Sequence, residues 1–375
     1  MIYLDNSATS YPKPQSVINA VEFCLKNLSA NPGRSGHKAS LAASDALEQA
    51  RLTAAKLLSA NRDDVFFMLN CTDALSCAIF GLLKPGDHVI TTVFEHNSVL
   101  RPLEMLRKQD KITFDCALPG PDGRITAGTI DALRRKNTAM VIVNHISNVC
   151  GVKCETEEIN SYCMQNGIVF CLDAAQSAGC ETLRADMADI ICMPGHKGLL
   201  GPMGSGLMYI APDVNVLPLR VGGTGSQSES LDQPVFRPDR YESGTQALPA
   251  IIGLEAGIKT VMGRVEEICR REKYLAQLLT DGLESIKGVN VLSPHKVQSG
   301  VVLFNVRDID SRRISYLLDR DFDIATRAGY HCAPLAHKYL GTMSQGGVRA
   351  SVGYANSAED ICAAVAAVEA IARSE

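Results

Sequence analysis

The stretch "MPGHKGLLGPMGSG" (residues 193–206) sets Lys197 between a histidine and a run of glycines, directly after the apolar segment "ADIICMPG" (188–195). A lysine so close to glycine turns is either a solvated loop residue or a group kept there for chemistry. Taken alone, such a lysine is more often solvated. The strands and polar side chains around it decide between the two interpretations.

Short apolar runs rich in β-branched residues alternate with longer helical patterns along most of the chain. This alternation is typical of an α/β protein with a mostly parallel sheet covered by helices. The chain has 375 residues, too many for one small domain, because single cores stop growing at about 250 to 300 residues. The predicted strands are 64–69, 88–94, 139–146, 167–173, 189–193 and 205–211, and a helix is predicted over 38–60.

From about residue 250 the pattern changes to that of a smaller α+β domain. One long helix, or a broken one, covers 247–286, a later helix opens at Asp310, and the last is capped at Ser357. We therefore expect a large domain over 16–250 and a small domain formed by 1–15 and 251–375. The stretch 220–245, rich in Gly, Ser and Pro, reads as a long functional loop, and its "GGTGS" lacks the Lys-Ser/Thr of a phosphate loop.

Composition excludes several classes of function. The net charge is -4 and charged residues make up 21% of the chain, so no basic excess is present to attract nucleic acid or anionic lipid. The N-terminus lacks the pattern of a signal peptide, and no apolar run approaches the roughly 20 residues of a membrane span. We expect a cytoplasmic protein without a nucleic-acid or membrane partner.

The 13 cysteines are scattered without a CxxC pair. The nearest approach to a metal signature is His145 with Cys150 and Cys154, and this spacing matches no common zinc pattern. We therefore predict no metal site. The absence of close pairs also counts against a non-enzymatic, cysteine-rich metal or redox protein, and a visible absorption spectrum would separate that class from a pigmented enzyme.

Polar residues follow several of the predicted strands, at the sheet edge where ligands of open α/β sheets collect. Thr72 and Asp73 open a helix after 64–69, and the free N–H groups of such a turn can cradle a phosphate. Asp173 closes an apolar strand, with Gln176 three residues on. A buried carboxylate needs a partner, and a protonated heterocyclic nitrogen would serve.

Lys197 lies 24 residues after Asp173, beyond the next strand. Neighbouring strand ends could therefore hold both side chains in one pocket. A desolvated lysine has a lowered pKa and attacks carbonyls, which makes it the usual Schiff-base residue. Together with the phosphate cradle, the pattern indicates the lysine of a pyridoxal phosphate enzyme, with Asp173 holding the pyridinium proton.

With these residues in place, the chain resembles the class V aminotransferase family and, within it, the group II cysteine desulfurases of the SufS type. The resemblance implies the PLP-dependent transferase fold type I, a homodimer and pyridoxal 5'-phosphate as cofactor. The motifs that carry it are "YLDNSAT" (3–9), "TDAL" (72–75), "EHNS" (95–98), "SNVCG" (147–151), "DAAQS" (173–177), "GHKG" (195–198), "ESGT" (242–245), "RAGYHCA" (327–333) and "RASVGYAN" (349–356).

The same resemblance implies the residues around the cofactor ring and the substrate. His96 would stack on the ring, Asn148 would lie beside ring and substrate, and Gln176 would bond the ring hydroxyl. It assigns the grip on the substrate carboxylate to Arg349, whose guanidinium suits a bidentate contact. Arg327 is expected to assist.

For the cofactor phosphate, the resemblance implies Thr72, next to Asp73, and His196, with Thr245 reaching over from the other subunit. Two features depart from the family pattern. Pro194 can donate no backbone hydrogen bond to a phosphate, so one contact is expected to be absent. The pair Asn70-Cys71 replaces a glycine-rich turn, which leaves the shape of the cradle open.

Cys332 is the expected sulfur acceptor. It lies between Arg327 and Arg349 and beside His331, a cationic setting that favours the thiolate. The short "RAGYHCAP" segment implies that Cys332 moves little and that a partner protein carries the sulfur away.

The resulting hypothesis is conversion of L-cysteine to L-alanine, with sulfur passed to Cys332 as a persulfide and the α-proton moved by Lys197 or His96. Selenocysteine lyase remains open as an alternative, because it would use nearly the same residues. Another class V lyase or transaminase would not need Cys332.

Overall fold

The computed structural model describes residues 1–33, 35–120 and 123–374, and its centre is a seven-stranded sheet. The five strands at one side run parallel, whereas β8 runs antiparallel to both of its neighbours, which confirms a mostly parallel sheet. In spatial order the strands are β2 (Val65–Met68), β8 (Gly206–Ile210), β7 (Ile190–Pro194), β6 (Val169–Asp173), β5 (Thr138–Asn144), β3 (Asp87–Thr92) and β4 (Ile112–Ala117).

The edge strand β4 was not among the predicted strands. Only its first and last residues are buried, so its "ITFDCA" lacks the apolar run that marks the central strands. A half-exposed edge strand carries a weaker sequence signal than one covered on both faces.

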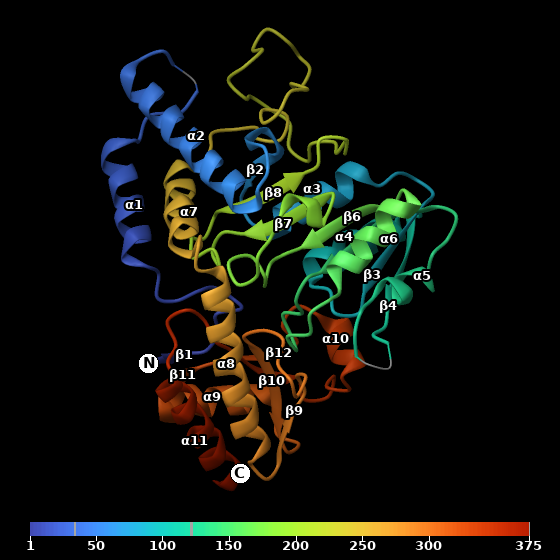
Figure 1. Cartoon of the computed structure of the whole chain (residues 1–375), viewed down its shortest axis with the longest axis vertical. Helices are drawn as coiled ribbons and strands as arrows, with labels where there is room; N and C mark the ends of the chain where they lie inside the picture. Colours follow the sequence, from blue (N-terminus) through green and yellow to red (C-terminus); the bar gives the residue numbers. More distant parts are fainter. Residues whose placement is uncertain (34, 121–122, 375) are drawn as a thin grey trace.

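Helices cover both faces of this sheet, which is why the central strands read as continuous apolar runs. Alternate side chains enter two separate cores: Phe67 and Ile191 lie in one, Phe66 and Ile190 in the other. Figure 1 shows α7 and α2 on the side of the first core and α3 and α4 in the region of the second. The covering helices are α2 (Lys38–Leu58), α6 (Thr156–Asn166) and α7 (Leu248–Val261) on one face, and α3 (Cys71–Leu82) and α4 (Asn97–Lys108) on the other.

A second, antiparallel sheet of four strands forms the lower part of Figure 1. Its core is built around Leu279, Phe304 and Leu318. The strands are β12 (Arg327–Gly329), β13 (Gly347–Ser351), β10 (Val301–Val306) and β9 (Val289–Val291), and the helices are α8 (Val265–Glu284), α9 (Ser311–Phe322) and α11 (Ala358–Ser374), with α10 (Pro334–Tyr339) beside them. This is the expected smaller α+β unit.

The predicted helix caps agree with the structure, which also decides between one helix and two over 247–286. The segment over 247–286 divides into α7 and α8 at 262–264, where Gly263 has φ +83°. Asp310 caps α9 by accepting from the N–H of Arg312, and Ser357 Oγ accepts from the N–H of Asp360 at the start of α11.

The N-terminal segment joins the smaller sheet region. β1 (Ile2–Tyr3) pairs in parallel with β11 (Ile324–Ala325), and α1 (Gln15–Asn27) then packs against α7. The division at 16 and 250 stays a prediction, and α7 packs with the helices of the larger sheet.

The remaining helix of the larger part is α5 (Ala127–Asp131). Among the described residues, no helix combines the length and the apolar character needed to cross a membrane.

A buried ion pair connects α2 to the loop over 220–245. Arg51 donates through both terminal nitrogens to the Glu242 carboxylate, at 2.7 and 2.8 Å, and the N–H of Phe67 in β2 donates to the same carboxylate at 2.7 Å. Both charged side chains are almost fully buried. Glu48 Oε2 is the next carboxylate oxygen, 3.7 Å from Arg51 Nε and without a hydrogen bond to it, so removing Glu242 leaves the buried Arg51 charge poorly compensated.

We expect Glu242→Ala to lower the free energy of unfolding by about 3 to 5 kcal/mol, because the Arg51 guanidinium would stay buried without its carboxylate. Chemical denaturation measures this change. The double variant Arg51→Met/Glu242→Leu should be less destabilised than Glu242→Ala. Equal losses in both variants would mean that packing, and not the unpaired charge, sets the cost.

Candidate functional site

An open cavity of about 790 Å³ lies at the carboxyl ends of β5, β6 and β7. Residues from the large sheet, from the N-terminal segment and from the smaller sheet meet there, so the cavity forms only when all three parts have folded. Its lining includes Ser7, Asn70, Cys71, Thr72, His96, Ser98, Asn144, Asn148, Asp173, Gln176, Pro194, His196, Lys197, Arg327, His331 and Arg349.

The register of the sheet brings the central groups together. Asn144 lies opposite Asp173 at the ends of β5 and β6, and Asp173 lies opposite Cys192 near the end of β7. Lys197 follows in the turn after β7. Gly198 is required there, because a Cβ atom at this position would lie 2.3 Å from the carbonyl oxygen of Ala178. The glycines around the lysine thus allow two turns to pack closely and hold its backbone at the cavity wall.

The Lys197 amine and the Asp173 carboxylate stabilise each other's charged form inside this cavity. Burial lowers the pKa of the Lys197 amine, and the Asp173 carboxylate acts against that shift. Burial likewise raises the pKa of Asp173, and its hydrogen bond from a backbone N–H and the Lys197 charge act against it. Each group therefore favours the charged form of the other, which is the behaviour expected of paired charges out of water.

The Asp173 carboxylate is oriented by two donors on the same oxygen. Its Oδ1 accepts from the N–H of Ala175 at 2.9 Å and from Cys71 Sγ at 3.5 Å. Cys71 is the first residue of α3, so the turn that departs from the family pattern contributes a thiol to the carboxylate.

His96 and Thr72 share a hydroxyl network at the start of two helices. His96 caps α4: its Nδ1 accepts from the N–H of Ser98 at 3.0 Å and lies 2.8 Å from Ser98 Oγ. Thr72 Oγ1 lies 2.7 Å from the same hydroxyl. Burial, with the nearby charge of Lys197, lowers the pKa of His96 to about 4. The ring is therefore neutral at pH 7 and, since Nδ1 accepts, its proton sits on Nε2.

A carboxylate from the N-terminal segment holds Arg349. Asp5 Oδ1 accepts from Arg349 Nη2 at 2.6 Å, and Nη1 donates to the carbonyl oxygen of Asn148 at 3.0 Å. Arg349 is 1% exposed, so this pairing offsets the cost of burying its charge. Asn148 in turn donates from Nδ2 to the carbonyl oxygen of His331 at 2.7 Å.

Cys332 lies in a strained turn beside the cavity. His331 and Cys332 both adopt left-handed φ values, +50° and +57°, a conformation that costs non-glycine residues of order 1 to 3 kcal/mol each. Arg327 Nη2 lies 3.8 Å from Cys332 Sγ. The His331 ring does not supply the expected second cation: burial lowers the pKa of His331 to about 3, and the ring bonds His337 and the Arg327 carbonyl oxygen.

Three residues of the cavity lining carry a buried polar atom that has no partner among the described residues. These atoms are His196 Nδ1, Asn148 Oδ1 and Arg349 Nε. Burial, then the charges of Lys197 and Lys13, lowers the pKa of His196 to about 4. Native proteins rarely leave buried polar atoms unpaired, so a polar ligand that reaches these three atoms fits the site.

Two of the predicted cofactor residues lie away from the lining. The Asp73 carboxylate accepts from the N–H of Leu69 and pairs with Arg220, both at 3.0 Å. Thr245 is exposed on its loop and does not line the cavity of this chain. Gln176 lines it and donates to the carbonyl oxygen of Ser7 at 3.1 Å.

Sequence reasoning did not assign roles to Asp5, Ser98 and Glu95. All three fall inside motifs that carry the resemblance, "YLDNSAT" and "EHNS", and this position was the only signal that could have found them.

Among residues 1–33, 35–120 and 123–374, no group of three or more His, Cys, Asp or Glu side chains is arranged to hold a metal ion.

The fold and the site together define the class. A mostly parallel sheet flanked by helices, a smaller α+β unit, and a lysine facing a strand-end aspartate describe a PLP-dependent transferase of fold type I. The family model for class-V aminotransferases matches residues 2–363, and the chain belongs to that family.

Curated relatives and a solved structure agree with this assignment. The chain is 34% identical to a probable cysteine desulfurase of Pyrococcus abyssi over 100% of this chain and 95% of the relative. It is 32% identical to a probable cysteine desulfurase of Methanothermobacter thermautotrophicus, over 96% of this chain and 92% of the relative. The apo structure of a cysteine desulfurase from Thermococcus onnurineus NA1 superposes with a TM-score of 0.93 at 32% identity, covering 100% of this chain and 95% of that one.

Glu95, directly before His96, is fully buried behind the site. Its Oε1 accepts from Thr92 Oγ1 at 2.7 Å and from the N–H of Asn144 at 3.0 Å. Burial raises the pKa of Glu95 from 4.5 to about 8. The folded protein therefore holds a proton here that the unfolded chain releases above pH 4.5.

The stability that Glu95 contributes is fully present below about pH 4.5 and is lost as pH rises through about 8. Glu95→Gln imitates the protonated carboxyl, so its free energy of unfolding should fall less over this window, by up to about 4 kcal/mol relative to the parent. Urea denaturation at several pH values measures the slopes. The exposed control Glu157→Gln should keep the parent slope, and a parent-like slope in Glu95→Gln would contradict the assignment.

Proposed function

We propose that this chain is a PLP-dependent cysteine desulfurase of group II, which converts L-cysteine to L-alanine and takes the sulfur on Cys332 as a persulfide. The observation that carries the proposal is a thiol with a guanidinium 3.8 Å away, next to a cavity that holds both Lys197 and Asp173. A transaminase needs the lysine and the aspartate but not the thiol. The names of the relatives above support the same activity.

The residues of the cavity fit pyridoxal 5'-phosphate. Lys197 would hold its aldehyde carbon, Asp173 its ring nitrogen, and Gln176 its ring hydroxyl, while the ring would lie against His96. The unpartnered Nδ1 of His196 and the hydroxyl of Thr72 are suited to the phosphate, and Asn148 to the space between ring and substrate. When bound, the cofactor supplies an electron sink that stabilises negative charge at the substrate carbon.

Asp73 has an indirect part in this proposal. Its carboxylate binds the Leu69 N–H and Arg220, and Asn70 Oδ1 accepts from the Asp73 N–H at 2.9 Å. These contacts fix the first turn of α3, whose free N–H groups and dipole favour an anion. Pro194 lines the cavity without a backbone N–H, so the phosphate depends more on side chains.

Arg349 binds the substrate carboxylate, with Asn148 and Arg327 beside it. Only two donors of its guanidinium are used, on Asp5 and on the carbonyl of Asn148, and its Nε has no partner among the described residues. A guanidinium has five N–H donors, so a carboxylate can be gripped without breaking the Asp5 pair.

Proton transfer divides between Lys197 and His96. The Lys197 amine, whose pKa burial lowers, is the group able to accept the α-proton of the substrate. His96 is neutral with its proton on Nε2, so it can donate from that atom but cannot accept there. Ser98 holds this tautomer in place.

Cys332 then takes the sulfur in a balanced step. Its thiolate forms a bond to the substrate sulfur as the Cβ–S bond breaks, and the electron pair of that bond stays on carbon, where a proton completes the methyl group of alanine. The substrate thiol hydrogen remains on the terminal sulfur of the persulfide. Arg327 stabilises the attacking thiolate at 3.8 Å.

A homodimer and a sulfur-acceptor protein complete the proposal. Thr245 is exposed on its own chain, as a residue that reaches a second subunit's phosphate site must be. The Cys332 backbone is held to the start of α4, since the N–H of Asn97 donates to its carbonyl oxygen at 2.7 Å. A thiol restrained in this way moves little, which favours a partner that comes to collect the sulfur.

Lys197→Ala should abolish the visible absorption band that borohydride removes from the parent protein, because no other lysine lines the cavity among the described residues. Absorption spectroscopy before and after borohydride measures this. Lys153→Ala, at an amine paired with Glu181 outside the cavity, serves as control and should stay yellow. A reducible band in Lys197→Ala would overturn the assignment.

Cys332→Ala should fold, stay yellow and release almost no alanine from L-cysteine, because the sulfur has no acceptor. It should keep much of its turnover of selenocysteine, whose selenium leaves without a thiol nucleophile. Alanine release and mass spectrometry of the Cys332 peptide after cysteine treatment measure both points. The exposed Cys362→Ala is the matched control and should behave as the parent. Full cysteine turnover by Cys332→Ala, or added sulfur on another cysteine, would refute the proposed function.

A further inference from the structure

Three buried side chains form a row behind Cys332, which begins at His331 in the cavity lining and leads away from the cavity. His331 Nδ1 lies 3.1 Å from His337 Nε2, and His337 Nδ1 lies 2.7 Å from Thr342 Oγ1. The other nitrogen of His331, Nε2, lies 3.2 Å from the carbonyl oxygen of Arg327. The exposed fractions of the three side chains are 3%, 0% and 3%, so water does not compete for these contacts.

The direction of every bond in this row is determined. The Arg327 carbonyl can only accept, so His331 Nε2 carries a proton and donates to it. Burial lowers the pKa of His331 to about 3 and of His337 to about 4, so both rings are neutral at pH 7. His331 Nδ1 must then accept from His337 Nε2, which leaves His337 Nδ1 as the acceptor of the Thr342 hydroxyl at 2.7 Å. The His337 carbonyl oxygen, at 3.3 Å, is the more distant second acceptor of this hydroxyl. Turning over either ring would break two bonds at once.

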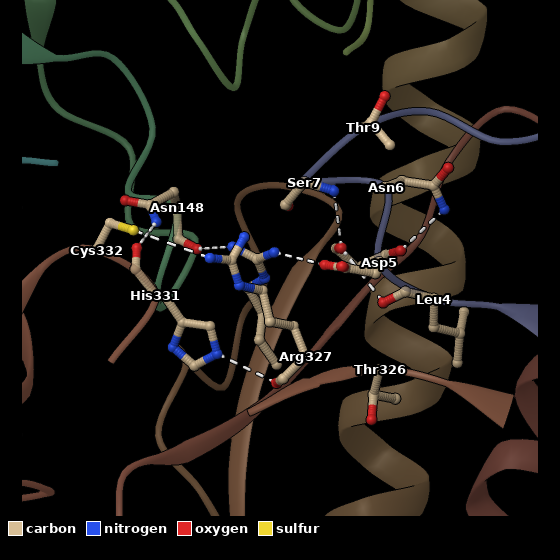
Figure 2. A network of polar contacts seen from close by, with 12 residues as sticks. Leu4, Asp5, Asn6, Ser7, Thr9, Asn148, Thr326, Arg327, His331 and Cys332 are labelled. Carbon is tan, nitrogen blue, oxygen red and sulfur yellow. Dashed lines mark hydrogen bonds and ion pairs between the residues drawn. The ribbon is translucent and has the colours of Figure 1, made fainter. Parts of the chain in front are cut away.

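The hydrogen bonds of this row hold the turn of residues 327–332, which carries the Cys332 thiol, in its shape. The His331 ring ties the end of the turn back to the Arg327 backbone, and the Arg327 side chain reaches Cys332 from the same residue. On the opposite side, Asn148 and Asn97 hold the carbonyl oxygens of His331 and Cys332. Figure 2 shows the His331 ring pointing away from Cys332 and toward the Arg327 backbone, while the Arg327 guanidinium lies on the Cys332 side.

We propose that Thr342 and His337 are positioning residues for sulfur transfer, which act through His331 to keep Cys332 in its left-handed conformation beside the Arg327 guanidinium. Neither residue touches the cavity. Without the row, the left-handed residues 331 and 332 would relax, and the thiol would leave the position from which it reaches the substrate sulfur. This inference rests on the proposed function, because it assigns its purpose to the transfer of sulfur to Cys332.

The test compares Thr342→Val with Thr342→Ser in the cofactor-loaded protein. Valine keeps the shape of threonine and removes the hydroxyl, whereas serine keeps the hydroxyl and loses only a methyl group. A matched control is Thr280→Val, at a buried threonine of α8 whose hydroxyl has no partner among the described residues. It reports what a buried threonine-to-valine change does by itself.

For Thr342→Val we expect kcat with L-cysteine to fall roughly tenfold and KM to change less than about twofold. The loss in kcat should be smaller than the loss of about 100-fold that a misplacement of 1 Å can cause. Selenocysteine turnover should stay near that of the parent. The rate at which iodoacetamide alkylates Cys332, followed by mass spectrometry of its peptide, should rise severalfold because the turn is loosened. Thr342→Ser and Thr280→Val should match the parent in all of these measurements.

Parent-like alkylation and kcat in Thr342→Val would overturn the inference. Equal losses of cysteine and selenocysteine turnover, with a lower melting temperature, would also overturn it, since they would show a purely structural role. The proposed function fails separately: full cysteine turnover by Cys332→Ala would refute it, whereas the alkylation rates would still show whether Thr342 controls the Cys332 turn.

Discussion

The mutual stabilisation of Asp173 and Lys197 is the constraint on which the rest of the site depends. Both groups face one cavity at the ends of adjacent strands, where burial disfavours each charge and the partner favours it. Parallel pairing of β5, β6 and β7 sets their separation, so the sheet register is a condition of the chemistry. The close glycine turn at Gly198 holds the lysine backbone at the wall.

The smaller sheet completes this site from the opposite side. Asp5 and Arg349 come from segments far apart in the chain and form a partly buried ion pair, and Arg349 then contacts the loop of Asn148. Through Asn148 the contact continues to the backbone of His331. A continuous set of hydrogen bonds therefore links the proposed substrate-binding guanidinium of Arg349 to the turn of Cys332. These bonds fix the position of the guanidinium relative to the thiol.

His331 and His337, behind Cys332, are neutral like His96 but differ from it in their hydrogen-bond partners. His96 lines the cavity, and only its Nδ1 has a hydrogen-bond partner among the described residues. His331 and His337 use all of their ring nitrogens on one another, on a hydroxyl and on a carbonyl. We therefore propose that the same chemical group acts in proton transfer at one position and holds backbone geometry at another.

The order of apolar runs and helical patterns was enough to predict a mostly parallel sheet with a smaller α+β unit, and a lysine and an aspartate at neighbouring strand ends, since each depends on local periodicity. It left open whether the helix over 247–286 is broken. Tertiary structure alone decided the rest. Asp5 and Arg349 are more than 340 residues apart, the Asp73 carboxylate turns toward Arg220, and His331 faces His337 instead of supplying a cation to Cys332. Which polar group a buried charge meets depends on how distant segments pack, and no local pattern of residues records that choice.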